Sequence, residues 1–294
     1  KEFFGEKIGL IAGFLYAISP VIVLYSKSSW NPNIVPFFSI ATIYFLYKGV
    51  DAKRSVFLFL SGLSFGVLMQ LHYLASFIGV VMFVFVLVTS FSEKIVWLSK
   101  IKNLLIRSFT LASGFLVSFS PFFLFEVRHN LLNTRNITNF ILTSEETGVS
   151  LSFFPQVLHV LERLFAGLVL NYPLPHHQYL YPKDILSIWI YFAIALASVS
   201  IIFFLASLIR RGILSNKSLV LLLWFVIPLV LFGFYKKDIY DYYLGIIFPL
   251  PFLMVGNFLY SFSNIRIKFF RNWSLKILGM LLLIILAIAS IHRG

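Results

Sequence analysis

Two lysines and a run of tyrosines stand together in the stretch FYKKDIYDYYLGIIFPLP. Lys236 and Lys237 come at the end of one apolar run, and Tyr240 and Tyr243 lead into the next one. Ammonium groups bind phosphate as point charges, and the attraction grows where water is excluded. The stretch therefore predicts a site for a phosphate group at headgroup depth. The alternative is a pair of lysines snorkelling within a belt of interfacial aromatics.

Two shorter polar stretches could border the same kind of site. FEVRHN places Glu126, Arg128 and His129 directly after an apolar run, and SKSSWNPN places Trp30 and Asn31 between two others. Each stretch has a simpler interpretation: an Arg and Glu pairing as a helix ends, and a tight turn with an aromatic anchor. The sequence leaves both interpretations open.

The composition indicates that lipid is the solvent for most of this chain. Of its 294 residues, 60% are hydrophobic and only 12% charged, about half the charged share of an ordinary globular protein. The net charge of +13 is spread over short connections, so it favours a membrane protein over a nucleic-acid-binding one. The absence of cysteine excludes disulfides, thiolate metal sites and a Cys nucleophile.

Windows of about 20 residues predict an all-α polytopic integral membrane protein with about nine transmembrane helices. The expected spans are 8–25, 34–48, 55–71, 74–91, 108–125, 185–208, 219–234, 244–262 and 277–291.

The basic residues predict the orientation of these spans. With a cytoplasmic N-terminus, 16 of the 24 Lys and Arg fall on the inner side, as the positive-inside rule requires. Residues 1–294 then form a single transmembrane domain, and 127–184 form one long external loop. Within that loop, 151–170 has helical amphipathic spacing and is expected to lie in the interface. Residues 93–107 are expected to form a second surface helix, on the cytoplasmic side.

Three stretches resemble the GT-C superfamily of membrane glycosyltransferases, in the branch of the protein O-mannosyltransferases and lipid A aminoarabinose transferases. They are EKIGLIAGFLYAISPVIVLYSKSSWNPNIVPFFSIATIYFLYK, PFFLFEVRHNLLNTR and KKDIYDYYLGIIFPLPFL. The resemblance implies transfer of a hexose or pentose from a polyprenyl-phosphate donor to a protein, lipid or glycan acceptor on the outer face. It also implies a plasma membrane location, which we expect to be prokaryotic, with an external or periplasmic active face.

Under this resemblance Lys236 and Lys237 hold the lipid phosphate, and Tyr240 and Tyr243 frame the lipid or stack on sugar. Glu126, Arg128, His129, Trp30 and Asn31 are the further expected substrate contacts. The family carries an acidic residue in its first external loop, whereas this chain resembles the family from the third span onward. We therefore expect an N-terminally truncated chain whose catalytic base lies upstream, with Asp238 and Asp241 as substitutes. The family often uses a divalent metal such as Mg²⁺ or Mn²⁺, but amides stand at Asn31 and Asn33, where some relatives carry an acid, and no metal ligand is predicted here.

Other functions stay open at this stage. An O-antigen ligase or polymerase also combines many spans with a long external loop, but it should carry more external arginine. A lipid or polysaccharide flippase should carry inverted repeats and charge in a central cavity, and neither is evident in the sequence. A pseudo-enzyme that binds prenyl lipid without turnover is the third alternative.

Overall fold

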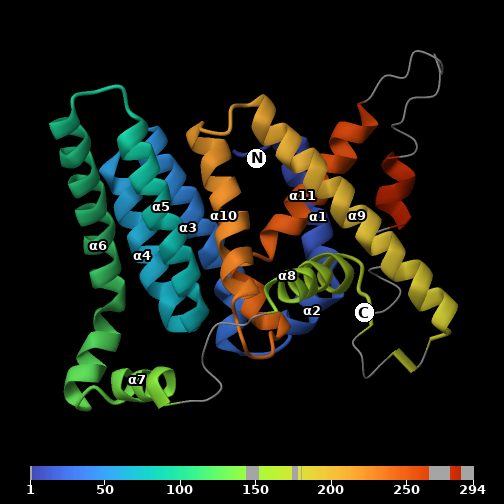
Figure 1. Cartoon of the computed structure of the whole chain (residues 1–294), viewed down its shortest axis with the longest axis horizontal. Helices are drawn as coiled ribbons and strands as arrows, with labels where there is room; N and C mark the ends of the chain where they lie inside the picture. Colours follow the sequence, from blue (N-terminus) through green and yellow to red (C-terminus); the bar gives the residue numbers. More distant parts are fainter. Residues whose placement is uncertain (1, 144–151, 174–177, 180, 265–278, 286–294) are drawn as a thin grey trace. The chain divides into compact units, whose positions relative to one another are not determined.

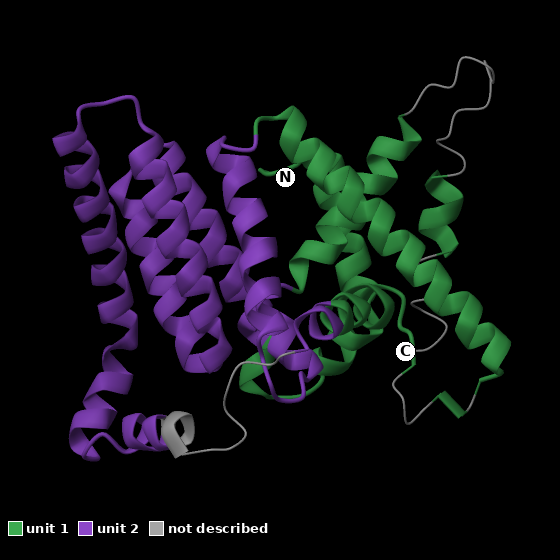
Figure 2. Cartoon of the chain, in the orientation of Figure 1, with its two compact units in different colours: residues 1–33, 158–212, 248–294 green, residues 34–157, 213–247 purple. Residues whose placement is uncertain are grey.

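The computed structural model describes residues 2–143, 152–173, 178–179, 181–264 and 279–285. Within those residues the regular structure is helical and there is no β-strand, which confirms the all-α class. The chain divides into two compact units, each built from segments distant in sequence (Figure 2). Unit 1 contains residues 1–33, 158–212 and 248–294, and unit 2 contains residues 34–157 and 213–247.

Unit 2 is a bundle of long apolar helices that lie side by side (Figure 1). α4 packs between α3 and α6, and α10 packs against α5 and α3. A 3₁₀ turn, η2, joins α4 to α5, and a second one, η5, follows α10. The bounds are α3 Val35–Asp51, α4 Ser55–Leu71, η2 Tyr73–Ala75, α5 Ser76–Ser92, α6 Trp97–Arg128, α7 Leu132–Thr143, α10 Asn216–Gly233 and η5 Asp241–Ile246.

Glycines bring the backbones of α4 and α6 into contact. A Cβ added to Gly62 would lie 2.0 Å from the carbonyl oxygen of Leu111, and one added to Gly114 would lie 2.1 Å from that of Phe59. Gly66 completes a GxxxG spacing on the same face of α4. Small residues are what membrane helices use at their interfaces, because lipid supplies no hydrophobic force to join them.

Unit 1 packs α1 and α9 against α11. Gly256 allows α11 to approach α1, because a Cβ there would lie 3.2 Å from the carbonyl oxygen of Ile8. Asn257 is buried and exchanges hydrogen bonds with Ser207 on α9, with a nitrogen-to-oxygen distance of 3.1 Å. The bounds are α1 Glu6–Ile18, α2 Pro20–Ser26, the π-helix η3 Arg163–Val169, α9 Lys183–Arg210 and α11 Pro249–Ser263. Two further segments cross the division between the units: η1 Asn31–Ile34 and α8 Phe153–Glu162.

Among the described residues, five helices are long and apolar enough to cross a membrane, and six if one bent pair counts as a single span. The prediction of about nine spans is therefore not confirmed. The five are Asn31–Asp51, Tyr73–Ser92, Trp97–Arg128, Lys183–Arg210 and Asn216–Gly233.

The expected span 8–25 is two helices, α1 and α2, bent by 63°. Ser19 has extended backbone at the break, and Pro20 begins α2. Proline disfavours helical backbone in the residue before it and suits the first turn of a new helix. The hydroxyl of Ser19 donates to the carbonyl of Leu168, 2.7 Å away, which ties the bend to η3.

The surface helix expected at 93–107 is not separate, because α6 runs without a break from Trp97 to Arg128. At about 1.5 Å per residue, its 32 residues extend about 48 Å, well beyond a hydrocarbon core of about 30 Å. Helical backbone bonding continues through the basic segment, so the predicted break between two elements was wrong.

Four other expected segments are shorter, divided or only partly described in the structure. Expected span 244–262 becomes η5 followed by α11, which has 15 residues. Expected span 55–71 is α4, a shorter apolar helix of 17 residues. The expected interfacial helix 151–170 is α8 followed by η3, and five apolar side chains of η3 are buried in protein. Expected span 277–291 lies partly outside the described residues.

Candidate functional site

Six aromatic side chains of unit 2 form a cluster with Tyr243 at its centre. The ring centroid of Tyr243 lies 4.6 Å from that of Tyr242, 5.1 Å from His72 and 5.5 Å from Tyr240. The rings of Tyr235 and Tyr73 lie 6.1 and 6.4 Å from it. We call these six residues the aromatic cluster. It joins the ends of α4 and α10 to the start of η5, segments far apart in the sequence.

Hydrogen bonds to one backbone carbonyl hold the tyrosine segment in place. The carbonyl oxygen of Ile246 accepts from the Ser39 hydroxyl at 2.6 Å and from the Trp224 indole N–H at 2.9 Å. Ser39, Trp224 and Ile246 are all buried. Gly245 lies against Val35, which a Cβ at that position would approach to 3.2 Å. α3 and α10 thereby fix η5 and the tyrosines that precede and begin it.

His72 links the cluster to the turn between α4 and α5. Its Nδ1 accepts a hydrogen bond from the Leu74 N–H at 3.3 Å, and its ring stacks on Tyr73 with centroids 4.8 Å apart. Burial lowers the pKa of His72, because desolvation disfavours the imidazolium. His72 is therefore neutral at pH 7, and its proton lies on Nε2 since Nδ1 acts as the acceptor.

The cluster keeps its tyrosines as neutral phenols. Burial raises the pKa of Tyr243 and of Tyr235 above the ordinary value for tyrosine. The hydroxyls of Tyr73 and Tyr235 lie 3.0 Å apart and share a hydrogen bond. Neutral phenols offer O–H donors and aromatic faces together, a combination suited to sugar hydroxyls and to lipid.

The charged residues of this segment lie between α10 and η5. Lys236 is exposed and Lys237 is partly exposed. Asp238 is exposed, and Asp241 is the first residue of η5. The sequence-predicted Tyr240 is half-exposed and stacks on Tyr242 at 5.8 Å. The structure thus gathers Tyr240 and Tyr243 in the aromatic cluster and places the two lysines in the segment that leads into it.

Glu126 has a structural role in the turn after α6. Its buried carboxylate accepts hydrogen bonds from the Asn133 and Thr134 backbone N–H groups at 3.1 and 2.8 Å, and from the Thr134 hydroxyl at 2.6 Å. These bonds satisfy the free N–H groups of the first turn of α7. Arg128 is exposed, and the ring of His129 stacks on that of Phe125, 4.0 Å away. These contacts all lie within the α6–α7 turn.

Trp30 and Asn31 belong to unit 1 and form a compact turn. The Asn33 side-chain amide donates to the backbone carbonyls of Tyr25 and Ser28, which closes the turn. Trp30 is 45% exposed, its ring lies 6.3 Å from that of Tyr25, and Asn31 is exposed. The stretch SKSSWNPN therefore forms a closed turn with an aromatic anchor.

The described residues contain no group of three His, Asp or Glu side chains close enough to hold a metal ion. The divalent cation that the family resemblance implies thus finds no ligand set in this part of the chain, and no chemical step is assigned to it.

Sequence reasoning did not single out His72, Tyr73, Tyr235 and Tyr242 as site residues. His72 and Tyr73 stand between two apolar runs, in QLHYLA, and Tyr235 and Tyr242 stand in the predicted lysine-tyrosine stretch. The signal available was their common position at helix ends. These four side chains come into contact only through long-range packing, which no local sequence pattern predicts.

Within the described residues the regular structure is all helical and includes five helices long and apolar enough to span lipid, which indicates a membrane protein. Residues 1–125 match the family model of dolichyl-phosphate-mannose-protein mannosyltransferase. This match confirms the resemblance to GT-C membrane glycosyltransferases and covers α1 to most of α6, less than half of the chain. No curated protein and no solved structure matched the chain in the same comparisons.

Proposed function

We propose that the chain forms part of a glycosyltransferase that moves a sugar from a polyprenyl-phosphate donor to an acceptor on the outer face of the membrane. The observation that carries this proposal is the lysine pair beside the aromatic cluster, in a chain whose first 125 residues match a mannosyltransferase family. The acceptor in this proposal is a protein, lipid or glycan. The membrane is the prokaryotic plasma membrane, with a cytoplasmic N-terminus.

Lys236 and Lys237 hold the donor phosphate in this proposal. When the sugar leaves, negative charge develops on that phosphate, and fixed cations near it lower the barrier. Their position next to η5 supports the role, because the double hydrogen bond to Ile246 keeps the segment from moving away. The attraction is strongest where water is excluded, as at the edge of a lipid bilayer.

The aromatic cluster receives the sugar or the first prenyl unit of the donor. Tyr240 is half-exposed at the edge of the cluster and Tyr243 is at its centre. Tyrosine rings pack against the apolar faces of sugars and prenyl chains, while their hydroxyls bind sugar oxygens. The neutral His72 adds the Nε2–H donor to this set.

The transfer also needs a base to accept the proton of the acceptor hydroxyl. Asp238 and Asp241 are the carboxylates nearest in sequence to the lysine pair, and we assign the role to one of them. Glu126 holds the turn that carries Arg128 and His129, and these two are proposed to meet the acceptor. Trp30 and Asn31 are a proposed substrate contact of unit 1.

The decisive experiment removes the two lysine charges. Lys236→Ala/Lys237→Ala in the complete natural protein should lower sugar transfer in isolated membranes by roughly 100-fold, the scale of losing transition-state charge stabilisation. The charge-matched control is Lys94→Ala/Lys102→Ala, two exposed lysines elsewhere in unit 2. Normal transfer in the first variant, at equal protein level, would refute the phosphate role. A protein that moves the donor across the bilayer without sugar transfer would be a flippase instead.

A further inference from the structure

A second polar site lies at the opposite end of α4 and α5 from the aromatic cluster. α4 begins at this site with Ser55 and ends beside His72, and α5 runs back to end beside Glu93. At about 1.5 Å per residue, the 17 residues of α4 separate the two ends by about 26 Å. A bilayer that contains the aromatic cluster at one face therefore places this second site near the other face.

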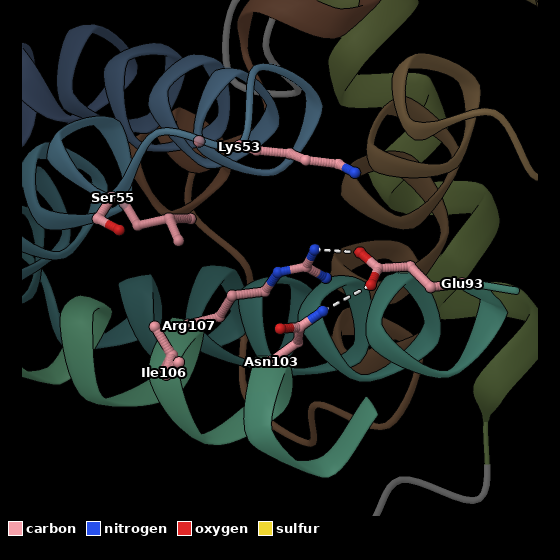
Figure 3. Close-up of a pocket in the computed structure, with 8 residues that line it drawn as sticks. Lys53, Ser55, Glu93, Asn103, Ile106 and Arg107 are labelled. Carbon is pink, nitrogen blue, oxygen red and sulfur yellow. Dashed lines mark hydrogen bonds and ion pairs between the residues drawn. The ribbon is translucent and has the colours of Figure 1, made fainter. Parts of the chain in front are cut away.

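The second site is a pocket of about 160 Å³ in unit 2 (Figure 3). Lys53, Ser55, Glu93, Asn103 and Arg107 give it a polar lining. A cavity needs about 10–15 Å³ of such volume to hold one water molecule, so this pocket has room for a small polar group such as a phosphate.

Hydrogen bonds hold Arg107 and Glu93 in fixed positions. The Arg107 guanidinium donates to the Glu93 carboxylate and, at 3.1 Å, to the Ser90 hydroxyl. The Asn103 amide donates to the other Glu93 oxygen at 2.7 Å. Burial by itself raises the pKa of Glu93, but the hydrogen bonds from Arg107 and Asn103 outweigh it and leave that pKa below its usual value. Glu93 is ionised at pH 7, and three of the five guanidinium N–H donors of Arg107 have no acceptor among the described residues.

Lys53 gives the pocket an excess of positive charge. Its amino group reaches over the Arg107–Glu93 pair (Figure 3) and makes no hydrogen bond or ion pair within the described part of the chain. The two cations and one carboxylate sum to one positive charge. α4 adds to this field, because its N-terminal N–H groups begin at Ser55 without a side-chain cap. The lining therefore suits one anionic group rather than a cation.

One exposed apolar side chain lines the polar pocket, and others lie around the start of α6, the helix that carries it. Ile106 lines it and is 46% exposed, while Val96, Trp97 and Leu98, around the start of α6, are 75%, 63% and 75% exposed. A free phosphate ion gains nothing from such a border. An anionic headgroup with acyl chains attached gains from both parts, since the chains cover this surface.

We propose that this pocket binds the phosphate headgroup of an acidic phospholipid, with the acyl chains against the apolar start of α6. The site is separate from the lysine pair, and its occupancy does not depend on sugar transfer. By the positive-inside bias of the sequence, it faces the cytoplasmic leaflet.

Native mass spectrometry of the whole chain in mixed micelles tests the proposal, with phosphatidylglycerol and phosphatidylcholine as competing probes. The wild type should retain phosphatidylglycerol in preference. Lys53→Asn should weaken that binding roughly five-fold, the effect of one basic residue near an anionic lipid. Asparagine tolerates the left-handed backbone of Lys53, whose φ is 52°, so the change removes charge without added strain.

Two further variants distinguish an effect of charge from an effect of partial unfolding. Glu93→Gln should strengthen phosphatidylglycerol binding by a similar factor, because it removes the one negative charge of the pocket. Lys102→Gln, an exposed lysine of α6 outside the pocket, should change nothing. Partial unfolding cannot produce opposite effects in the Lys53 and Glu93 variants.

Three results would overturn the proposal. They are equal binding of both lipids by the wild type, an effect of Lys102→Gln as large as that of Lys53→Asn, and displacement of the lipid by excess inorganic phosphate. The last result would show an anion site that does not need acyl chains. Retained phosphatidylglycerol in excess phosphate is the expected outcome.

Discussion

Alanine at Gly62 tests whether backbone contact holds α4 and α6 together. A methyl group there would lie 2.0 Å from the Leu111 carbonyl oxygen, whereas ordinary contacts of a Cβ begin at 3.4 Å. The two helices must therefore separate locally by about 1.4 Å or distort. Overpacking of this kind costs about 1–3 kcal/mol.

Gly13 supplies the matched control for this substitution. It lies within α1, and a Cβ added to it would meet nothing within 4 Å. Alanine is favoured over glycine in a helix by about 1 kcal/mol at either position. The difference in the free energy of unfolding between Gly62→Ala and Gly13→Ala thus isolates the packing cost, about 1–3 kcal/mol, because the helix-propensity gain cancels.

Thermal unfolding of both variants in the same detergent, followed by far-ultraviolet circular dichroism, measures this difference. At roughly 2–4 °C for each kcal/mol, Gly62→Ala should melt between about 2 and 12 °C below Gly13→Ala. Gly114→Ala, whose methyl group would meet the Phe59 carbonyl oxygen at 2.1 Å, should show a similar loss. The double variant should lose less than the sum, because the first methyl group already separates the helices. Equal melting temperatures for Gly62→Ala and Gly13→Ala would refute the close contact of α4 and α6.

Three further predictions concern hydrogen bonds and pH. Trp224→Phe removes the indole N–H that donates to the Ile246 carbonyl and also removes part of a fully buried side chain; it should lower the free energy of unfolding by at least about 1 kcal/mol, measured by the same melts, and an unchanged value would mean that neither the bond nor the packing adds stability. Burial lowers the pKa of His72 below its unfolded value of about 6.5. The free energy of unfolding is therefore highest, as far as this group is concerned, above about pH 6.5, and it decreases as the pH falls from there toward the folded pKa. Unfolding measured between about pH 7 and 5 should show a shallower dependence in His72→Asn, and an identical slope would contradict burial of a neutral imidazole. Asn257→Ala breaks the buried bond to Ser207 in unit 1 and should cost about 0.6–2 kcal/mol, whereas no loss would show that the hydroxyl finds another partner.

Much of the helical framework could be predicted from the sequence, since apolar runs in lipid have to form helices. Expected spans 34–48, 74–91, 185–208 and 219–234 each lie within or largely within an observed helix that is long enough to cross a membrane. The bend at Pro20 and the continuous α6 were not predicted. A hydropathy window averages over a bend, and it also ends wherever charge begins, although helical hydrogen bonding continues.

The candidate site could be predicted only in part. The lysine-tyrosine stretch was visible because its residues are neighbours in sequence. His72 was not, since it lies far along the chain from Tyr243 and reaches it only through the packing of α3 and η2 against η5. Glu126 was predicted as a substrate contact or as the partner of an arginine, but its carboxylate caps α7 through a turn that contains two left-handed residues, Asn130 and Leu131. No local pattern specifies that geometry.

The doubly bonded carbonyl of Ile246 sets where α11 can start. In a longer helix this oxygen would have to accept from the N–H four residues later, at Leu250. Both of its lone pairs already face Ser39 and Trp224, so the helix cannot grow backward by a turn. Such growth would convert the 3₁₀ helix η5, in which successive side chains turn by about 120°, into α-helix with about 100° per residue, and would move the rings of Tyr242 and Tyr243 away from their present neighbours. The Ile246 carbonyl, together with Pro249 at the start of α11, therefore keeps the tyrosine rings in the arrangement of the aromatic cluster.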